Sequence, residues 1–278
     1  MAVERSSIII TVFSTAPGVG KTLVATNFAA GLAKEGYNTC LIDLDLQFGD
    51  VENYLGFRGE YTLADARQAL LEADARGIPR SQVDMTSFLT EWRKGNVGFA
   101  VLPAPHSITE TYGLESRDVM DIVEGLRSFE YIVIDTTAVF SDLNMDMLDI
   151  STSIIFLGIM DFIPAIKNLK SGYDVLLRFD YEANKIRLVQ NRSDSQKLVS
   201  QREVEKLFGR EFYYNLPNDF PTARSSINFG VPAVLGTTHT KLGDSLWDLV
   251  GMFTNRPEAP KETTKPTGFF AKLSGLFR

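Results

Sequence analysis

Residues 14–22 read Ser-Thr-Ala-Pro-Gly-Val-Gly-Lys-Thr, and this stretch decides the fold. An apolar run over residues 7–13 precedes it, and a helical pattern over residues 23–34 follows it. A strand, a glycine turn and the start of a helix are typical of a phosphate-binding loop, because backbone N–H groups and the positive helix end can surround a triphosphate there. We expect a nucleotide to contact Pro17, Gly18, Val19, Gly20, Lys21, Thr22 and Leu23.

Two side chains of this loop have predicted chemical roles. Lys21 is expected to reach the outer phosphates and take part in catalysis, and the Thr22 hydroxyl is expected to bind Mg²⁺. The pattern Gly-x-x-x-x-Gly-Lys-[Ser/Thr] is incomplete, because its first glycine falls at Thr15. A Gly-Lys-Thr sequence can also end an ordinary turn, but the flanking strand, the helix and the acids that follow favour the phosphate loop.

Acidic residues end two further apolar runs. The run within residues 39–50 carries Asp43 and Asp45, and the run within residues 130–137 carries Asp135. Ligands of open parallel sheets bind outside the carboxyl ends of the strands. Asp43 and Asp45 have the same parity on a strand, so both are predicted to face the loop. We expect Asp43 and Asp135 to hold Mg²⁺, Asp135 through a water, and Asp45 to position a water for catalysis. For any single acid, a helix cap or a solvated loop is the alternative.

The chain resembles the MinD/ParA group of P-loop ATPases, which dimerise around two nucleotides. Within that group, the run over residues 41–51 most resembles the TadZ/CpaE branch of pilus-assembly localisation ATPases. The likeness covers most of residues 7–253 and includes the segments 54–56, 62–65, 189–192, 216–219 and 228–232. It implies ATP or ADP with Mg²⁺ as cofactor, a homodimer formed through the nucleotide, and pilus or secretion assembly proteins as partners.

The resemblance also implies a site for the base. Asn191 matches the position that recognises adenine in this group, and Arg192 follows it. A side-chain amide supplies both the donor and the acceptor that an adenine edge requires. The alternative for Asn191 is an Asx turn after a strand. Pro217, Asn218 and Asp219 resemble the base-contacting loop of the group.

Two departures from the family pattern bear on turnover. The signature lysine that reaches across the dimer falls at Ala16, and the next glycine is Pro17. Losing the lysine removes a cation that would neutralise charge during phosphoryl transfer, so we expect slow or absent hydrolysis with binding retained by Lys21 and Thr22. Many TadZ/CpaE proteins also carry a receiver-like domain before the ATPase. Here the first expected strand begins at residue 7, so this member lacks that domain or the chain is a fragment.

Composition and patterning predict one α/β domain over residues 1–254. The chain has 278 residues, of which 44% are apolar and 23% charged, enough for a large core. Strand-like and helix-like segments alternate, which predicts a doubly wound, mostly parallel sheet flanked by helices. Beyond the strands already described, we expect strands at 97–102, 153–157, 186–190 and 211–216, and helices near 62–75, 117–128, 164–178, 201–208 and 242–253.

Composition also excludes several functions. The single cysteine, Cys40, lies in an apolar run, which favours a buried side chain in a reducing cytosol and excludes an iron–sulfur cluster. His106 and His239 are far apart and cannot form a zinc site alone. The net charge of −7 makes DNA an unlikely partner. No run reaches the roughly 18 apolar residues of a membrane span, and the N-terminus has no secretory pattern, so a cytoplasmic location is expected.

The C-terminal residues differ in character from the rest. Residues 255–267 contain three prolines and alternating charge, which predicts a linker. Residues 268–278 place an apolar stripe on one helix face beside basic residues, which predicts a membrane-targeting helix that binds anionic lipid at the inner face of the cell membrane. This segment resembles the C-terminal helix of MinD, and the alternative is a helix docked on its own domain. The expected membrane contacts are Phe269, Phe270, Lys272, Leu273, Leu276 and Phe277.

Several functions remain open at this point. The first is a membrane-associated positioning ATPase that localises a pilus or secretion apparatus. The second is a nucleotide-binding adaptor of the same fold without turnover, for which Ala16 is the main support. A MinD-like regulator of the cell-division site is a further alternative. Residues 17–22 also resemble the loop of bacterial tyrosine kinases, but those end in a tyrosine cluster, and the last tyrosines here are Tyr213 and Tyr214.

Overall fold

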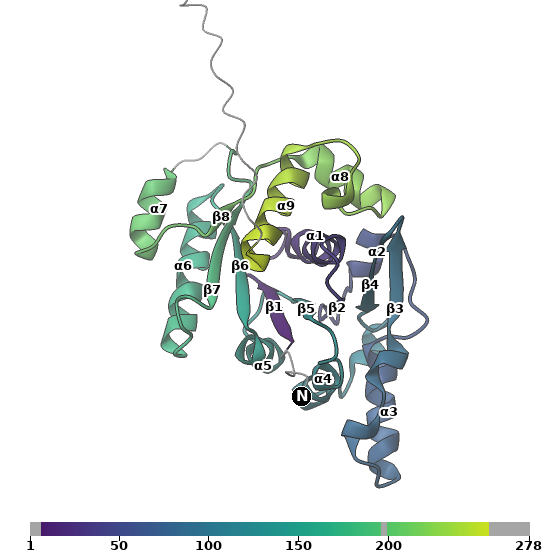
Figure 1. The fold of residues 1–278 in the computed structure, drawn as a ribbon. Helices are drawn as coiled ribbons and strands as arrows, with labels where there is room; N and C mark the ends of the chain where they lie inside the picture. Colours follow the sequence, from purple (N-terminus) through teal and green to yellow (C-terminus); the bar gives the residue numbers. More distant parts are fainter. Residues whose placement is uncertain (1–6, 196–198, 256–278) are drawn as a thin grey trace, which may run out of the picture.

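A computed structural model describes residues 7–195 and 199–255 of the chain. Within these ranges the strands form one eight-stranded sheet in the order β3-β4-β2-β5-β1-β6-β7-β8 (Figure 1). The strands pair in parallel except for β3 and β4 at one edge, which are antiparallel. The strands are β1 Ile8–Phe13, β2 Thr39–Asp43, β3 Thr90–Lys94, β4 Val97–Leu102, β5 Tyr131–Asp135, β6 Ser153–Ile159, β7 Ile186–Asn191 and β8 Tyr214–Asn215.

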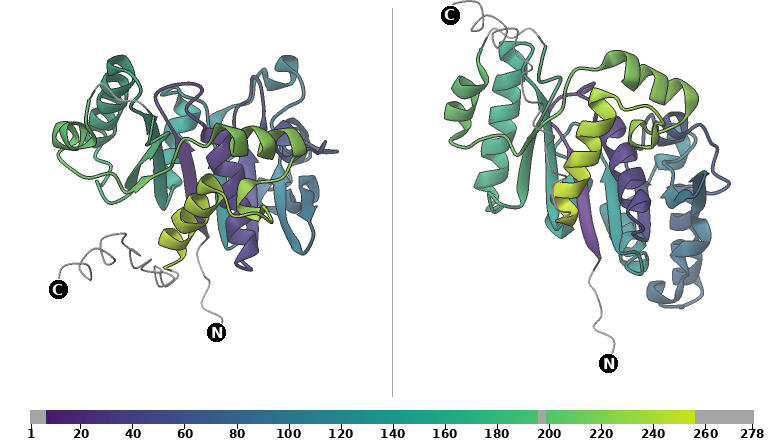
Figure 2. Two further views of the ribbon diagram at one scale, coloured as in Figure 1. Left: turned by 90° about the horizontal axis from the view of Figure 1, so that it is seen from above. Right: turned by 45° about the horizontal axis from the view of Figure 1, so that its top comes forward.

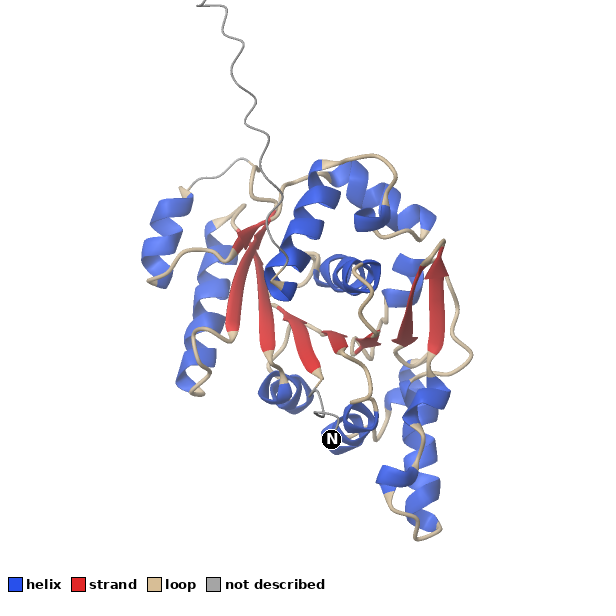
Figure 3. Cartoon of the chain, viewed as in Figure 1, coloured by secondary structure: helices blue, strands red, loops and turns tan. Residues whose placement is uncertain are grey.

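Helices cover both faces of this sheet (Figures 2 and 3). One face packs against α1, α2, α8 and α9, and the other against α3, α4, α5, α6 and α7. The helices are α1 Lys21–Lys34, α2 Val51–Leu55, α3 Leu63–Ala75, α4 Ser116–Gly125, α5 Asp142–Ile150, α6 Ile163–Arg178, α7 Gln201–Phe208, α8 Phe220–Phe229 and α9 Lys241–Thr254. The doubly wound α/β fold predicted from the sequence is therefore confirmed.

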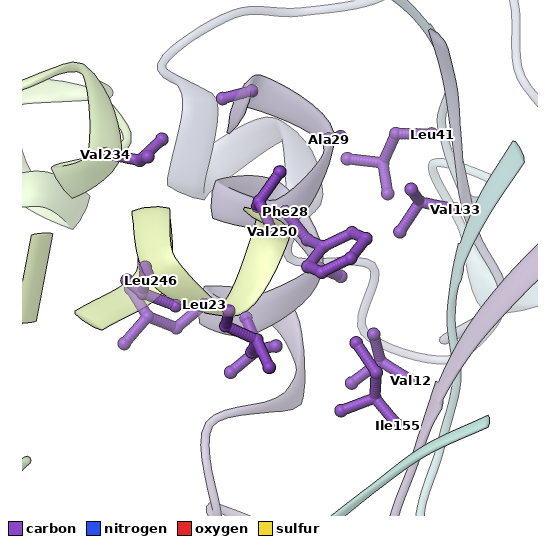
Figure 4. Close-up of a cluster of buried hydrophobic side chains, with 14 of the residues drawn as sticks. Val12, Leu23, Phe28, Ala29, Leu41, Val133, Ile155, Val234, Leu246 and Val250 are labelled. Carbon is purple, nitrogen blue, oxygen red and sulfur yellow. The ribbon is translucent and has the colours of Figure 1, made fainter. Parts of the chain in front are cut away.

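The central strand β1 shows why this sequence forms a buried parallel sheet. Ile10 and Val12 pack toward α1 and α9, whereas Ile9 and Phe13 pack toward the opposite helices, and all four are fully buried. Successive side chains of a strand point to opposite faces, so a strand covered on both sides is apolar at nearly every position, and in β1 all residues but Thr11 are apolar. Figure 4 shows Val12 in the hydrophobic cluster on the α1 and α9 side of the sheet, which also contains Phe28 of α1 and Val250 of α9. The packing fixes β1 and α1, and with them the loop that joins the two.

Several elements differ from the sequence expectations. The strand expected over residues 211–216 is reduced to the two residues of β8, so that prediction was wrong in extent. Four elements were not predicted: the exposed edge strand β3, the five-residue α2, α5, and α8, in which Ser226 alone is buried. These segments bury too few apolar side chains to show a clear period.

The structure bears on the predictions about membrane spans, the C-terminal segments and Cys40 to different extents. No described helix has the length and apolarity needed to cross a membrane. Asn255, the first residue of the predicted linker, ends α9 in a left-handed conformation. The remainder of the linker and the amphipathic segment 268–278 lie outside the described residues. Cys40 is fully buried on β2, as expected.

Candidate functional site

The predicted phosphate loop joins β1 directly to α1. Gly18 and Gly20 have φ angles of 69° and 100°, which lie in the left-handed region that favours glycine. Gly20 is the N-cap of α1, and no side chain caps the helix. The first backbone N–H groups of α1 therefore remain available at the positive end of the helix, where an anion binds most favourably.

Thr15, which replaces the first glycine of the motif, anchors the start of the loop to α6. Its hydroxyl donates a hydrogen bond to the Asn168 carbonyl oxygen at 3.1 Å. Its methyl group lies so close to Gly172 that a Cβ on that glycine would be 2.1 Å away. The Ala16 amide meanwhile donates to the Ser14 hydroxyl at 3.1 Å. The missing glycine is thus explained by a contact with a neighbouring helix and leaves the turn at Gly18 and Gly20 intact.

Lys21 lies among carboxylates from two other segments. Burial lowers the pKa of the Lys21 ammonium, and the charges of Asp135 and Asp45 oppose this by raising it. The structure therefore brings Lys21 near the carboxylates of Asp45 and Asp135. Asp45 itself lies beyond the end of β2, so the strand-parity argument for its orientation does not apply.

Asp135 has unmet hydrogen-bonding capacity. It ends β5, is 1% exposed, and neither carboxylate oxygen accepts a hydrogen bond of normal geometry within the described part of the chain. Burial raises the pKa of Asp135 to about 7, although the Thr22 hydroxyl and the Lys21 ammonium lower it, and Asp45 and Asp50 raise it further. A buried carboxylate whose oxygens accept no hydrogen bond is costly, so this site is suited to a ligand that brings hydrogen-bond donors.

The residues present at this point fit a hydrated Mg²⁺. Such an ion keeps several waters and takes its remaining ligands from one or two protein groups and from phosphates. Thr22 and Asp135 are the groups placed for this, and the ion would supply charge neutralisation of the phosphates. Among residues 7–195 and 199–255, no three His, Cys, Asp or Glu side chains gather into a metal site.

Asp43, also predicted to hold the metal, has a structural role in the fold. Its Oδ1 accepts a hydrogen bond from the Asp45 amide at 3.0 Å, and its Oδ2 accepts one from the Val51 amide at 3.1 Å. Burial raises the pKa of Asp43, as does the nearby charge of Asp135, while the two backbone amides lower it. The carboxylate therefore ties the loop after β2 to the first residue of α2. The oxygens of Asp135, by contrast, accept no such bonds within the described residues.

The predicted base-binding residues surround one cavity beside the loop. It has a volume of about 320 Å³. Those of the predicted residues that line it are Gly18, Gly20, Leu23, Asn191, Arg192, Pro217, Asn218 and Asp219. Asp219 has a second role, because its side chain caps α8 by accepting a hydrogen bond from the Thr222 amide at 3.2 Å. A larger cavity of about 870 Å³ lies between α8 and the β3–β4 turn and contains none of the predicted residues.

Sequence reasoning missed the walls that α2 and α8 give to the smaller cavity. Tyr54 comes from α2, and burial raises the pKa of its hydroxyl, as do the charges of Asp50 and Asp135. The remaining lining residues are Phe220, Ala223, Arg224, Ile227, Asn228 and Leu242. Neither α2 nor α8 was predicted as a helix, so the sequence did not place their side chains at this cavity, although Tyr54 and Asn228 fall in segments that carry the family resemblance.

Comparison with known proteins accords with this geometry. Residues 10–229 match the sequence model of the CobQ/CobB/MinD/ParA nucleotide binding domain. The chain belongs to this family. Among curated relatives, a putative septum site-determining protein MinD of Tupiella akineta is 25% identical over 99% of this chain and 87% of its own length. A tyrosine-protein kinase CpsD of Streptococcus pneumoniae is 30% identical, over 47% of this chain and 53% of its own.

Solved structures of MinD/ParA proteins share the fold. A ParA family ATPase from Chlorobium tepidum superposes with a TM-score of 0.77 at 20% identity, over 88% of this chain and 99% of that one. The septum site-determining protein MinD of Pyrococcus horikoshii, complexed with Mg-ADP, superposes with a TM-score of 0.73 at 19% identity, over 89% and 96% of the two chains. This MinD/ParA-type chain is therefore assigned to the P-loop fold by sequence and by structure.

Proposed function

We propose that the chain binds ATP and Mg²⁺ at the phosphate loop. The observation that carries the proposal is the proximity of Lys21, at the uncapped start of α1, to the buried carboxylate of Asp135, whose oxygens accept no hydrogen bond of normal geometry within the described residues. In this proposal Lys21 contacts the outer phosphates, and Thr22 and Asp135 hold the ion. Asp45 is proposed to position the attacking water. The family description, a nucleotide binding domain, supports the same assignment.

Nucleotide binding is proposed to drive homodimer formation through the edge of the sheet that carries the loop. Exposed apolar side chains follow three strands at this edge: Phe48 after β2, Phe140 after β5 and Phe162 after β6, with exposures of 70%, 40% and 55%. The carboxyl ends of parallel strands meet at one edge, so these side chains border the loop on the same side of the molecule. Apolar groups around a charged site suit a surface that a second copy covers.

Membrane attachment is proposed to depend on this dimer. The proposal rests on the sequence pattern of residues 268–278. Burying one large apolar side chain contributes about 1.5–3 kcal/mol at most, and ordering the segment costs about 1–2 kcal/mol per residue, so one tail binds weakly. Two tails on one dimer make the second insertion intramolecular, which raises avidity by about 10²–10⁴. Nucleotide binding, by forming the dimer, would thereby control attachment to the membrane.

We infer that the biological role is the positioning of a pilus or secretion apparatus, as in the TadZ/CpaE branch. The resemblance of residues 41–51 supports this branch. A MinD-like role in cell division is the second candidate, supported by the relative from Tupiella akineta that aligns over nearly the whole chain. A nucleotide-binding adaptor without turnover is favoured by Ala16. The kinase reading is weaker, since the CpsD relative aligns with about half of the chain.

Calorimetry with ATP and Mg²⁺ tests the central proposal. Wild-type protein should bind, and Lys21→Ala should lose at least about tenfold in affinity, because a cation aimed at the phosphates is removed. Lys94→Ala, which removes an exposed lysine of β3, is the matched control and should bind like wild type. Light scattering of the same samples should report a dimer with ATP and a monomer without it. Equal affinity of the Lys21 and Lys94 variants would remove the phosphate-loop assignment.

A further inference from the structure

Two consecutive side chains at the end of β7 hold two consecutive carbonyl groups of the phosphate loop. Asn191 Nδ2 donates a hydrogen bond to the Val19 carbonyl oxygen at 2.8 Å, and Arg192 Nη2 donates one to the Gly18 carbonyl oxygen at 3.1 Å. We propose that Asn191 and Arg192 are positioning residues that clamp the crest of the loop in its phosphate-binding conformation. This inference rests on the proposed nucleotide site and gives Asn191 a role other than reading the base.

The direction of the two bonds explains how a clamp would act. In a trans peptide the C=O and the following N–H point in opposite directions. Turning the Gly18 carbonyl toward β7 therefore turns the Val19 N–H away from it, and turning the Val19 carbonyl does the same for the Gly20 N–H. These are the groups that surround an anion in a phosphate loop. Fixing them before the nucleotide arrives removes part of the ordering cost of binding.

Asn191 is built into the loop rather than presented to the cavity alone. Its side chain is 5% exposed, and its Oδ1 accepts a hydrogen bond from the Arg192 amide at 2.9 Å. A Cβ on Gly20 would lie 2.7 Å from Asn191 Nδ2, so only glycine leaves room for the amide. Gly20 is thus required both by its φ of 100° and by the approach of Asn191. Both ends of the amide therefore bond to the backbone, Nδ2 to the loop and Oδ1 to the next residue of the chain.

Arg192 is held in an uncommon backbone conformation. Its φ is 53°, in the left-handed region that non-glycine residues rarely occupy, and such conformations gather at functional sites. This backbone turns the guanidinium back over the loop, where Asp161 at the end of β6 lies 3.9 Å from Nη1. The left-handed backbone at Arg192, directly after β7, is accompanied by contacts of its guanidinium with Gly18 and Asp161.

Relaxation measurements on nucleotide-free protein test the clamp directly. Asn191→Ala and Arg192→Met should lower the backbone order parameters of Val19 and Gly20 from about 0.85 toward 0.6, because the two carbonyls lose their donors. Arg192→Lys, which retains a donor of similar length, should restore most of the order. Arg187→Met is the matched control on the same strand, since Arg187 stacks on Tyr213 at the far end of β7. Unchanged order parameters in all variants would overturn the clamp.

Nucleotide affinities separate the clamp from base recognition. For both variants we expect about tenfold weaker binding of ATP and of GTP, an unchanged ATP-to-GTP ratio and unchanged adenosine binding, since the loss lies at the phosphates. Loss of adenosine binding or of the ATP preference would overturn the inference in favour of base reading. If wild-type protein binds no nucleotide, the proposed function fails, while the order parameters still decide the clamp.

Discussion

Asp43 and Asp135 are register partners at the ends of β2 and β5, yet the two carboxylates are used in opposite ways. Asp43 accepts hydrogen bonds from two backbone amides, whereas Asp135 accepts none of normal geometry within the described residues. Both side chains are almost fully buried. One acid therefore shapes the loop that follows β2, and the other leaves its hydrogen-bonding capacity for a ligand. Two strand ends that look alike in the sequence therefore carry acids with different hydrogen-bonding partners.

Replacing Asp135 should raise the stability of the fold and lower the affinity for ATP with Mg²⁺. Asp135→Asn removes a buried charge whose carboxylate oxygens accept no hydrogen bond of normal geometry within the described residues, so without nucleotide and metal the free energy of unfolding at pH 7.5 should rise by about 1–3 kcal/mol. Affinity for ATP with Mg²⁺ should fall in the same variant, because the ion loses its carboxylate. Urea denaturation in EDTA and calorimetry with Mg²⁺ measure the two effects. A variant that loses both stability and affinity would contradict the account of an unpaired carboxylate.

The stability gain of Asp135→Asn should depend on pH in a defined direction. Burial raises the pKa of Asp135 to about 7 from an ordinary value of 3.8, so the folded state binds the proton more tightly than the unfolded state. Stability from this group is fully present below about pH 4 and is lost as pH rises toward 7. The difference between variant and wild type should therefore be small at pH 4 and largest above pH 7. A difference that is constant across this range would place its origin elsewhere.

Ala16→Lys should raise the rate of ATP hydrolysis. The substitution supplies the cation that the family pattern places at this position, and an electrostatic contact of that kind changes phosphoryl-transfer rates by about tenfold or more. Ala16→Met is the matched control, with similar length and no charge. Phosphate release under saturating ATP is the measurement. Fast release by wild-type protein, abolished by Lys21→Ala, would instead show that another group already replaces the lysine and would end the adaptor alternative.

Gly230→Ala should lower the free energy of unfolding by disturbing the contact between the ends of α8 and α2, which both line the smaller cavity. Gly230 ends α8 with φ 62°, and a Cβ there would lie 2.7 Å from the Gly56 Cα at the end of α2. The left-handed conformation and the clash with backbone together should cost about 2–4 kcal/mol. Gly209→Ala is a matched control, since Gly209 has φ 69° but open space around its Cα, and should cost about 1 kcal/mol. Equal losses in chemical denaturation would show that α2 and α8 do not depend on this contact.

The parts of this fold that follow from local pattern were predictable. The strand β1, the glycine turn and α1 are contiguous, and buried strands such as β4 show as apolar runs. What was missed depends on segments distant in sequence. Thr15 is explained by Asn168 and Gly172 of α6, which a single sequence does not place beside it. α8 begins with a proline in its first turn and buries only Ser226, so its sequence resembles a loop.

Site residues also differed in how far their surroundings could be predicted. The place of Lys21 at the start of α1 was predictable, because it directly follows the glycine turn. Asp43 was less so, because its bond to Val51 depends on how the intervening residues fold back. Asn191 was placed near the nucleotide by resemblance, but its bond to Val19 is a tertiary contact between β7 and the loop. Chemistry at a strand end can be inferred from residue type, whereas the partner that takes up its hydrogen bonds cannot.

Removing residues 268–278 should abolish binding to anionic vesicles while ATP binding remains. The truncation leaves α9, which ends at Thr254, and every residue of the cavity in place. Phe270→Glu should have nearly the same effect, because it puts a charge in the predicted apolar face. Lys272→Gln should weaken binding mainly at low salt, since only the electrostatic part is screened. Co-sedimentation with and without ATP measures all three, and wild-type protein should bind more strongly with ATP because two tails then act together. Equal sedimentation of full-length and truncated protein would exclude the anchor and favour a tail docked on its own domain.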